Sequence, residues 1–328
     1  MQQHFSILGT GFHLPQRKLT AEDVDERAGK PRGWTRTHTG VVDRYECAAP
    51  ETLATMACAA IASAMRDALV RWRDIDLILD GSNCRHQPIP CNAAYLQHSL
   101  GPEASGIPCM DVQSTCLGFI VALHVANALF ATGAYRHILI VCSEQALLGV
   151  NWQEPESACL MGDGAAAVVL RRADPAPGYF FAHQTFGEHL DTCQIRGGGH
   201  VYPVTNYTPE TESAFRFHMD GPLLMRTAAK YLPPMTESLL AEAGLDAQDV
   251  HVIPHQAAPK ALNVMRRMLR FRAERFHNRV AQMGNLIAAS IPAVLHQTRA
   301  ERLISPGDPV LLLGTSAGYS QAGLIFRM

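Results

Sequence analysis

The sequence predicts an α/β fold built in layers, arranged as one large domain or as two halves that share a core. Apolar segments of strand length alternate along the chain with longer helix-like segments. The 328 residues are 47% hydrophobic and 18% charged, which is enough apolar material for a sizeable core. A Pro/Gly-rich break at residues 173–178 is the expected boundary between the halves, 1–175 and 176–328.

In the first half, short apolar runs predict strands at residues 5–8, 75–79, 107–112, 137–142 and 165–170. Runs with few helix breakers predict helices at residues 54–68, 91–100 and 117–131. The segment Gly9-Thr10-Gly11 is expected to end the first strand as a turn. It lacks the third glycine of the dinucleotide-binding fingerprint, and no acidic residue follows a second strand at the required distance. Nucleotide binding is therefore not expected.

In the second half, residues 197–211 predict a long irregular loop. Helices are expected at residues 221–243, 259–270 and 286–302. Strands are expected at residues 251–255, 309–313 and 323–326. Both halves thus place strands, turns and helices in a similar order, although no repeat is visible in the sequence itself.

Charge and cysteine content argue against several classes of function. The formal net charge of −2 disfavours nucleic acid as the main partner. The nine cysteines are odd in number and form no Cys-x-x-Cys pair, which disfavours a disulfide framework and a structural zinc site. No apolar run reaches the roughly 18 residues of a membrane span. The N-terminal segment lacks the pattern of a secretion signal, so a cytoplasmic location is the default expectation.

Cys116 lies where a short strand is predicted to end and a long helix to begin. In this position its sulfur faces the first helical turn, where unpaired backbone N–H groups and the helix dipole favour negative charge. These conditions lower the pKa of a thiol and raise its thiolate fraction. Cys116 is therefore a candidate nucleophile. The alternative interpretation is a small buried hydrophobic residue, which is a common role of free cysteine.

Two later segments, like the Cys116 segment, place a polar residue just before a predicted helix. His255 ends an apolar strand and precedes a helix, and Asn285 follows a glycine at the start of another helix. Taken singly, His255 is more simply a structural histidine and Asn285 a helix N-cap. Taken together with Cys116, they indicate a catalytic site. A neutral imidazole and an amide N–H can both donate to a developing oxyanion or enolate.

The chain resembles the β-ketoacyl-acyl-carrier-protein synthase III family, which has the thiolase fold. The resemblance covers nearly the whole chain. It is carried by blocks in the family's order: Ile7-Leu8-Gly9-Thr10-Gly11 with Leu14-Pro15, Trp34 with Thr39-Gly40-Val41, Thr115-Cys116-Leu117-Gly118-Phe119, Gly162-Asp163-Gly164-Ala165-Ala166, His255-Gln256-Ala257 and Gly284-Asn285.

The resemblance implies a five-layered α-β-α-β-α fold of two pseudo-equivalent halves, with the active site at their junction and a homodimeric assembly. It implies that Cys116 takes up an acyl group from a thioester. His255 and Asn285 would then hold a malonyl or β-ketoacyl thioester while decarboxylation generates the enolate that attacks the acyl-cysteine. Backbone N–H groups of Cys116 and of the loop at residues 314–318, here Ser316, would form the oxyanion hole. Substrates would be acyl-coenzyme A or acyl-carrier-protein thioesters of fatty-acid or polyketide-type biosynthesis, with no permanently bound cofactor.

The chain departs from the family at several of the positions that the resemblance assigns to substrate binding, which are Trp34, His38, Lys260 and Ile89. His38 stands where housekeeping members carry an arginine that helps to hold coenzyme A. Lys260 replaces a second arginine, Ala258 replaces an asparagine, and Ile89 replaces a phenylalanine that often caps the acyl pocket across the dimer. These departures indicate a specialised member, as in secondary metabolism, in which carrier-protein or unusual thioester donors are favoured over coenzyme A.

The helix predicted at residues 259–270 carries basic residues that can share part of one face, namely Lys260, Arg266, Arg267 and Arg270. Acyl carrier proteins are acidic, so this patch would steer their docking. The alternative interpretation is an ordinary solvated helix face.

Other functions fit less well. A papain-like hydrolase has the same Cys-His-Asn order and a Cys-to-His interval of about 130–150 residues, but its Cys-Gly-Ser-Cys-Trp context is missing. A degradative thiolase would need a second cysteine near the C-terminus, and no cysteine follows Cys193. Two alternatives stay open: acyl transfer to an oxygen or nitrogen acceptor without decarboxylation, and a non-catalytic partner subunit of a synthase.

Overall fold

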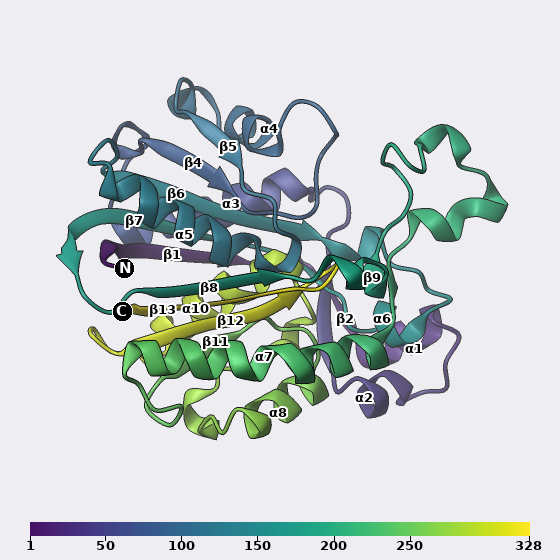
Figure 1. The fold of residues 1–328 in the computed structure, drawn as a ribbon. Coiled ribbons are helices and arrows are strands. Elements are labelled where there is room, and N and C mark those ends of the chain that lie inside the picture. The colour runs from purple at the N-terminus through teal and green to yellow at the C-terminus, as the bar shows by residue number, and fades with distance from the viewer.

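A computed structural model describes all residues from 1 to 328 and contains two main β-sheets (Figure 1). The first has the order β1-β7-β6-β4-β5, formed by β1 (Gln3–His13), β4 (Leu77–Asp80), β5 (Cys109–Asp111), β6 (His137–Gln145) and β7 (Asp163–Ala176). The second has the order β11-β12-β13-β8, formed by β8 (Phe180–Thr185), β11 (His251–Pro254), β12 (Pro309–Ser316) and β13 (Ser320–Arg327). Because the chain leaves the first sheet at Ala176 and enters the second at Phe180, we propose residues 1–175 and 176–328 as its two halves.

The two sheets repeat one topology. In each half the first strand pairs antiparallel with the last, as β1 does with β7 and β8 with β13. The last strand pairs antiparallel with the strand before it, and that strand pairs parallel with an earlier one, β6 with β4 and β12 with β11. Only β5 has no counterpart. The internal repeat therefore exists in the strand pairing, although the sequence does not show it.

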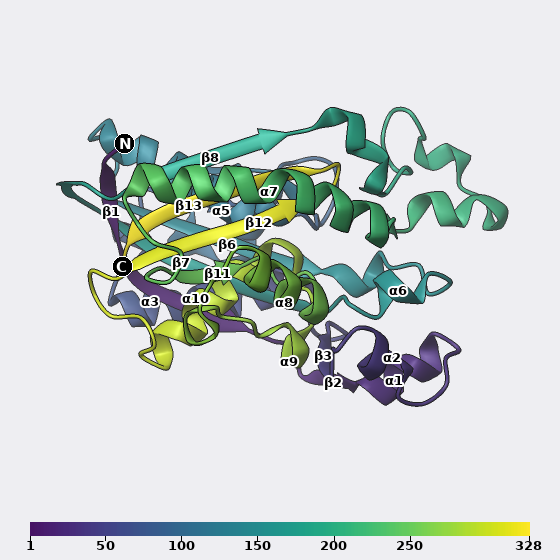
Figure 2. The same cartoon turned by 60° about the horizontal axis from the view of Figure 1, so that its bottom comes forward.

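Helices form three layers around and between the sheets (Figures 1 and 2). The outer face of the first sheet carries α3 (Leu53–Ala68), with α4 (Asn92–Ser99) beside it, and the outer face of the second carries α7 (Gly221–Ala243) and α8 (Pro259–Met268). Between the sheets lie α5 (Gly118–Ala131) and α10 (Ser290–Ala300), each in contact with strands of both sheets. This order confirms the predicted five-layered thiolase-like fold.

The core runs through the central layer. Helix α5 is apolar on nearly all sides because sheets cover it from two directions, and its Phe119, Leu123 and Phe130 are buried. They belong to one cluster with Ile291 and Val294 of α10 and with strands of both halves. Burying each such side chain contributes roughly 1.5–3 kcal/mol, so this layer holds the halves together. No helix in the structure, α5 included, combines the length and apolar character needed to cross a membrane.

The prediction of a turn at Gly9-Thr10-Gly11 is wrong, because these residues lie inside β1. A Cβ atom on Gly9 would lie 2.4 Å from the carbonyl oxygen of Ala64, and one on Gly11 would lie 2.0 Å from that of Ala60. Both carbonyls belong to α3. The two glycines therefore allow helix α3 to lie directly against strand β1. In the sequence, glycines with this packing role look the same as glycines in a turn.

One end of the sheets carries short elements that the sequence did not predict. Strand β2 (Arg17–Thr20) pairs with β3 (Asp43–Glu46), near α1 (Ala21–Arg27) and α2 (Trp34–His38). The other short elements of this end are α6 (Pro155–Ala158), α9 (Val280–Met283), β9 (Cys193–Gln194) and β10 (His218–Met219). The irregular loop predicted at residues 197–211 is confirmed, since it holds only short 3-10 turns, and it projects from the body in Figure 1.

Helix α5 approaches the first sheet most closely at its first residue. A Cβ atom on Gly118 would lie 1.9 Å from the carbonyl oxygen of Gly81, the residue after β4. Any larger residue at position 118 must push the helix start away from the sheet. The position of the turn that precedes α5 therefore depends on this contact between two glycines.

We expect Gly118→Ala to lower the free energy of unfolding by about 1–3 kcal/mol, because the added methyl group overlaps a backbone atom that cannot rotate away. Urea unfolding followed by circular dichroism measures the change. Gly187→Ala is the matched control, since a Cβ atom there meets nothing within 4 Å. Equal unfolding midpoints for the two variants would contradict the tight contact.

Candidate active site

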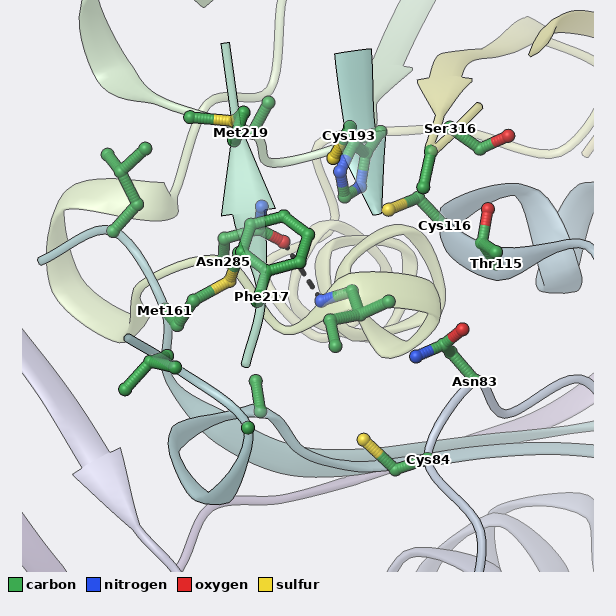
Figure 3. Close-up of a pocket in the computed structure, with 18 of the residues that line it drawn as sticks. Asn83, Cys84, Thr115, Cys116, Met161, Cys193, Phe217, Met219, Asn285 and Ser316 are labelled. Atoms are coloured by element: carbon green, nitrogen blue, oxygen red, sulfur yellow. Dashed lines mark hydrogen bonds between the residues drawn. The ribbon is translucent and has the colours of Figure 1, made fainter. Parts of the chain in front are cut away.

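A cavity of about 920 Å³ opens at the end of the sheets where loops of both halves meet (Figure 3). Its lining is mostly apolar. Cys116, His255 and Asn285 all line it, Cys116 from the first half and the other two from the second. The structure therefore brings the three predicted reactive side chains into one space, although His255 and Asn285 are far from Cys116 in the sequence.

Cys116 lies in a single 3-10 turn, Thr115–Leu117, that leads into α5. Its own backbone N–H and that of Ala317 face the sulfur, and both lower the pKa of the thiol. Burial outweighs them and raises this pKa above its usual range, and the acidic neighbours Cys193 and Glu144 add to the rise. The predicted low pKa is thus wrong for the resting protein, because burial of the thiol outweighs the effect of the facing N–H groups.

His255 follows β11 and is buried, with 5% of its surface exposed. Its backbone N–H donates to the carbonyl of Leu313 at 2.8 Å, which holds the residue beside β12. Burial lowers the pKa of the imidazole to about 4, so the ring is neutral near pH 7. Its Nδ1 atom is buried without a hydrogen-bond partner. His255 lines the cavity, and its Nε2 is the ring atom that we expect to interact with a molecule there.

Asn285 is fixed through its backbone and through its side chain. Its N–H donates to Leu160 at 2.8 Å, and its carbonyl accepts from Gly162 at 3.1 Å. Its side-chain Oδ1 accepts from the N–H of Ile287 at 2.9 Å, the dashed line in Figure 3. Since Oδ1 is used in this way, the amide Nδ2 is left as a donor for a ligand.

Equivalent 3-10 turns precede the central helices of the two halves, and Cys116 lies within the first while Asn285 lies just before the second. Thr115 begins the 3-10 turn before α5, and Ile287 begins the one before α10. Their φ angles are +46° and +45°, and they are the β-branched residues of this chain with positive φ. Such a conformation costs about 1–3 kcal/mol per residue and is retained where the surroundings impose it. Each central helix thus starts with the same strained turn at the cavity.

Ser316, the residue named from the sequence as a source of the oxyanion-hole N–H, is the last residue of β12 and lines the cavity. The N–H that faces the Cys116 sulfur comes from the next residue, Ala317. Both residues belong to the predicted loop at 314–318. A Cβ atom on Gly314 would lie 2.9 Å from the Cβ of His255, so this loop and the histidine are packed against each other.

Of the expected substrate-binding residues, Lys260 lines the cavity and Trp34, His38 and Ile89 do not. Lys260 donates to the backbone carbonyl of Thr37 at 2.7 Å and so links α8 to α2. The Trp34 ring stacks on His38 at 4.3 Å between centroids, and the Lys30 ammonium lies 5.1 Å from its centre. Ile89 is 83% exposed.

The predicted basic face of α8 is only partly formed. Lys260 and Arg267 are exposed and lie two helical turns apart, with Val264, a cavity residue, between them. Arg266 is partly buried and donates to the carbonyl of Phe271 at 3.1 Å, while Arg270 lies beyond the end of the helix. Lys260 thus lines the cavity, Arg267 lies further along the same exposed face, and Arg266 does not belong to that face.

Sequence reasoning missed several residues that line the cavity. Asn83 and Cys84 follow β4, Cys193 lies in β9, and Phe217 and Met219 come from the β10 segment. None belongs to a motif, and β9 and β10 are two residues long. Only the fold brings these positions to the site.

The 3-oxoacyl-[acyl-carrier-protein (ACP)] synthase III family matches residues 110–187, and the C-terminal region of the same family matches residues 240–328. The β-ketoacyl-[acyl-carrier-protein] synthase III of Alkalilimnicola ehrlichii is 30% identical over 323 residues, 98% of each chain. The crystal structure of the Aquifex aeolicus synthase III superposes with a TM-score of 0.88 at 26% identity and covers 100% of both chains.

The structure of the priming β-ketosynthase from the R1128 polyketide biosynthetic pathway superposes with a TM-score of 0.89 at 26% identity, covering 100% of this chain and 97% of that one. The matches extend over the full chain and include the segments of Cys116, His255 and Asn285. This chain belongs to the β-ketoacyl-acyl-carrier-protein synthase III family and is a condensing acyltransferase of that type.

Proposed function

We propose that this protein is a priming ketosynthase, which loads an acyl group on Cys116 and condenses it with a malonyl thioester by decarboxylation. One observation carries the proposal: a cysteine thiol, a neutral imidazole and an oriented amide donor line the same enclosed space. A nucleophile with two uncharged donors suits acylation followed by stabilisation of an enolate.

In the first half-reaction the Cys116 sulfur attacks the carbonyl carbon of the acyl thioester. The tetrahedral oxyanion accepts hydrogen bonds from the backbone N–H of Cys116 and one from the loop at residues 314–318. Collapse forms the acyl-cysteine bond and breaks the donor's C–S bond, and the proton of the thiol leaves with the donor thiol. Because burial raises the pKa of Cys116, the thiol is mostly protonated before the donor binds.

In the second half-reaction the malonyl thioester carbonyl lies between His255 and Asn285. Nε2 of His255 and Nδ2 of Asn285 donate to its oxygen. Loss of carbon dioxide leaves an enolate whose charge these two donors stabilise, and the enolate carbon attacks the acyl carbonyl on Cys116. The new carbon–carbon bond forms as the Cys116 sulfur departs, and the sulfur takes up a proton. The reaction needs no cofactor other than its thioester substrates.

The donor we propose is an acyl carrier protein in preference to coenzyme A. The Trp34 ring is already stacked by His38 and approached by Lys30, so a nucleotide base would have to displace these contacts. Lys260 at the cavity and Arg267 on the same exposed face of α8 suit an acidic carrier protein. A homodimer, as the family resemblance implies, is part of the same proposal.

Cys116→Ala should abolish the mass gain that the wild-type protein shows after incubation with acyl-carrier-protein or acyl-coenzyme A thioesters. The physical reason is that Cys116 combines a cavity position with two facing backbone N–H groups, its own and that of Ala317. Intact-mass spectrometry measures the adduct, and Cys109→Ala, outside the cavity, is the control. An adduct that persists in Cys116→Ala would place the nucleophile elsewhere.

His255→Ala and Asn285→Ala should still form the acyl adduct but lose condensation by about 10²–10³-fold each, the usual effect of removing one oxyanion donor. Single-turnover acylation and carbon dioxide release from malonyl-carrier protein separate the two steps. If both variants condense at the wild-type rate, the decarboxylative proposal is wrong. Acyl transfer to an oxygen or nitrogen acceptor then becomes the better candidate.

The rate of decarboxylation should show no inflection near the ordinary histidine pKa of about 6.5. Burial lowers the pKa of His255 to about 4, so the ring stays neutral as the pH falls from 8 to 5.5 and protonates only nearer pH 4. Carbon dioxide release across this range, with circular dichroism as a check on folding, measures the profile. A loss of rate centred near pH 6.5 in folded protein would contradict a neutral, buried His255.

A further inference from the structure

Gln256 lies between two residues that line the cavity but does not line it itself. His255 and Ala257 both contribute to the lining. The N–H of Ala257 donates to the carbonyl of His255 at 2.9 Å, so the three residues form one tight turn directly after β11. Gln256 is the middle residue of this turn and has 0% of its surface exposed. Its side chain is therefore packed in the protein interior, while its two neighbours face the cavity.

The side-chain amide of Gln256 makes three hydrogen bonds to the backbone. Its Nε2 group donates to the carbonyl of Pro254, the last residue of β11, at 2.7 Å and to the carbonyl of His277 at 3.2 Å. Its Oε1 atom accepts from the backbone N–H of Arg279 at 2.7 Å. Both N–H groups and the oxygen are used, which gives the amide a single orientation. One side chain thus joins the end of β11 to residues 277–279.

The segment bonded by Gln256 leads to the second proposed donor. Arg279 is the residue before α9, and Asn285 is the second residue after this helix ends. Because α9 has only four residues, little chain separates the hydrogen bond at Arg279 from Asn285. Gln256 therefore connects the turn that carries His255 to the segment that carries Asn285.

We infer that Gln256 is a positioning residue that fixes His255 and Asn285 relative to each other. The two donors must reach the same carbonyl oxygen, so their mutual spacing decides whether both can act. The inference rests on the proposed decarboxylative condensation and adds to it a residue that acts through the donors. Cys116 lies in a separate turn before α5, so its acylation should not depend on Gln256.

Two variants test the inference. Gln256→Glu keeps the shape and an acceptor for Arg279 but places a second oxygen against the carbonyls of Pro254 and His277. Gln256→Met keeps the length and removes all three hydrogen bonds. In both variants the acyl adduct on Cys116 should form near the wild-type rate. The kcat for carbon dioxide release from malonyl-carrier protein should fall by about tenfold or more, because a small misplacement of catalytic groups is costly.

A further measurement separates positioning from general damage. Gln256→Glu is also combined with His255→Ala. If Gln256 acts through His255, Gln256→Glu should slow carbon dioxide release by a smaller factor when His255 is absent. Asn127→Leu is the matched control, since this buried amide accepts from the N–H of His4 at 2.8 Å and donates to the carbonyl of Gln2 at 3.1 Å. It should leave the ratio of condensation to acylation unchanged.

The outcomes are distinct. Three results would overturn the positioning role and leave the ketosynthase proposal standing: normal condensation in both Gln256 variants, loss of acylation together with condensation in both, or equal slowing by Gln256→Glu in the two backgrounds. A wild-type protein that forms the acyl adduct but releases no carbon dioxide from malonyl-carrier protein would instead count against the proposed function itself.

Discussion

The active site depends on how closely the two central helices approach the backbone around them. Helix α5 can begin where it does because Gly118 lies against Gly81, and this contact sets the position of Cys116. The turn before α10 is fixed by the backbone bonds of Asn285 to Leu160 and Gly162. Both constraints are contacts between backbone atoms, and the residues with positive φ, Thr115 and Ile287, lie close to them in the sequence.

A second property of the site is that burial suppresses charge on its ionisable groups. Burial raises the pKa of the Cys116 thiol, raises that of Glu144 to about 8 and lowers that of His255 to about 4. Each of these groups is mostly uncharged near pH 7. Neutral donors such as His255 and Asn285 can stabilise a negative charge that develops during the reaction.

The sequence predicted the fold class and most of the long elements, because each depends on a local pattern, and it singled out Cys116, His255 and Asn285, which the structure brings to one cavity. Long segments rich in apolar residues predict α3, α5 and α7. Cys116, His255 and Asn285 each follow a strand or precede a helix. The predictions that were wrong share one cause: the contact that decides the structure joins residues that are far apart in the sequence. Gly9 and Gly11 were interpreted as a turn because the helix carbonyls that require them come some fifty residues later.

The same limit applies to the cavity and to the thiol. Strand β8 and the two-residue strands β9 and β10 have no recognisable pattern, so the cavity residues Phe217 and Met219 could not be assigned. The pKa of Cys116 was predicted to be low because the helix start is visible in the sequence, whereas the burial that raises this pKa is a property of the assembled core.

The division of the reactive residues between two halves of equal topology affects how the protein acquires activity as it folds. Cys116 belongs to a turn built on the first sheet, and His255 and Asn285 belong to elements of the second. A chain with only one sheet formed would hold either the proposed nucleophile or the proposed donors, but not both. In the proposed reaction, condensation therefore requires both sheets to be closed on α5 and α10.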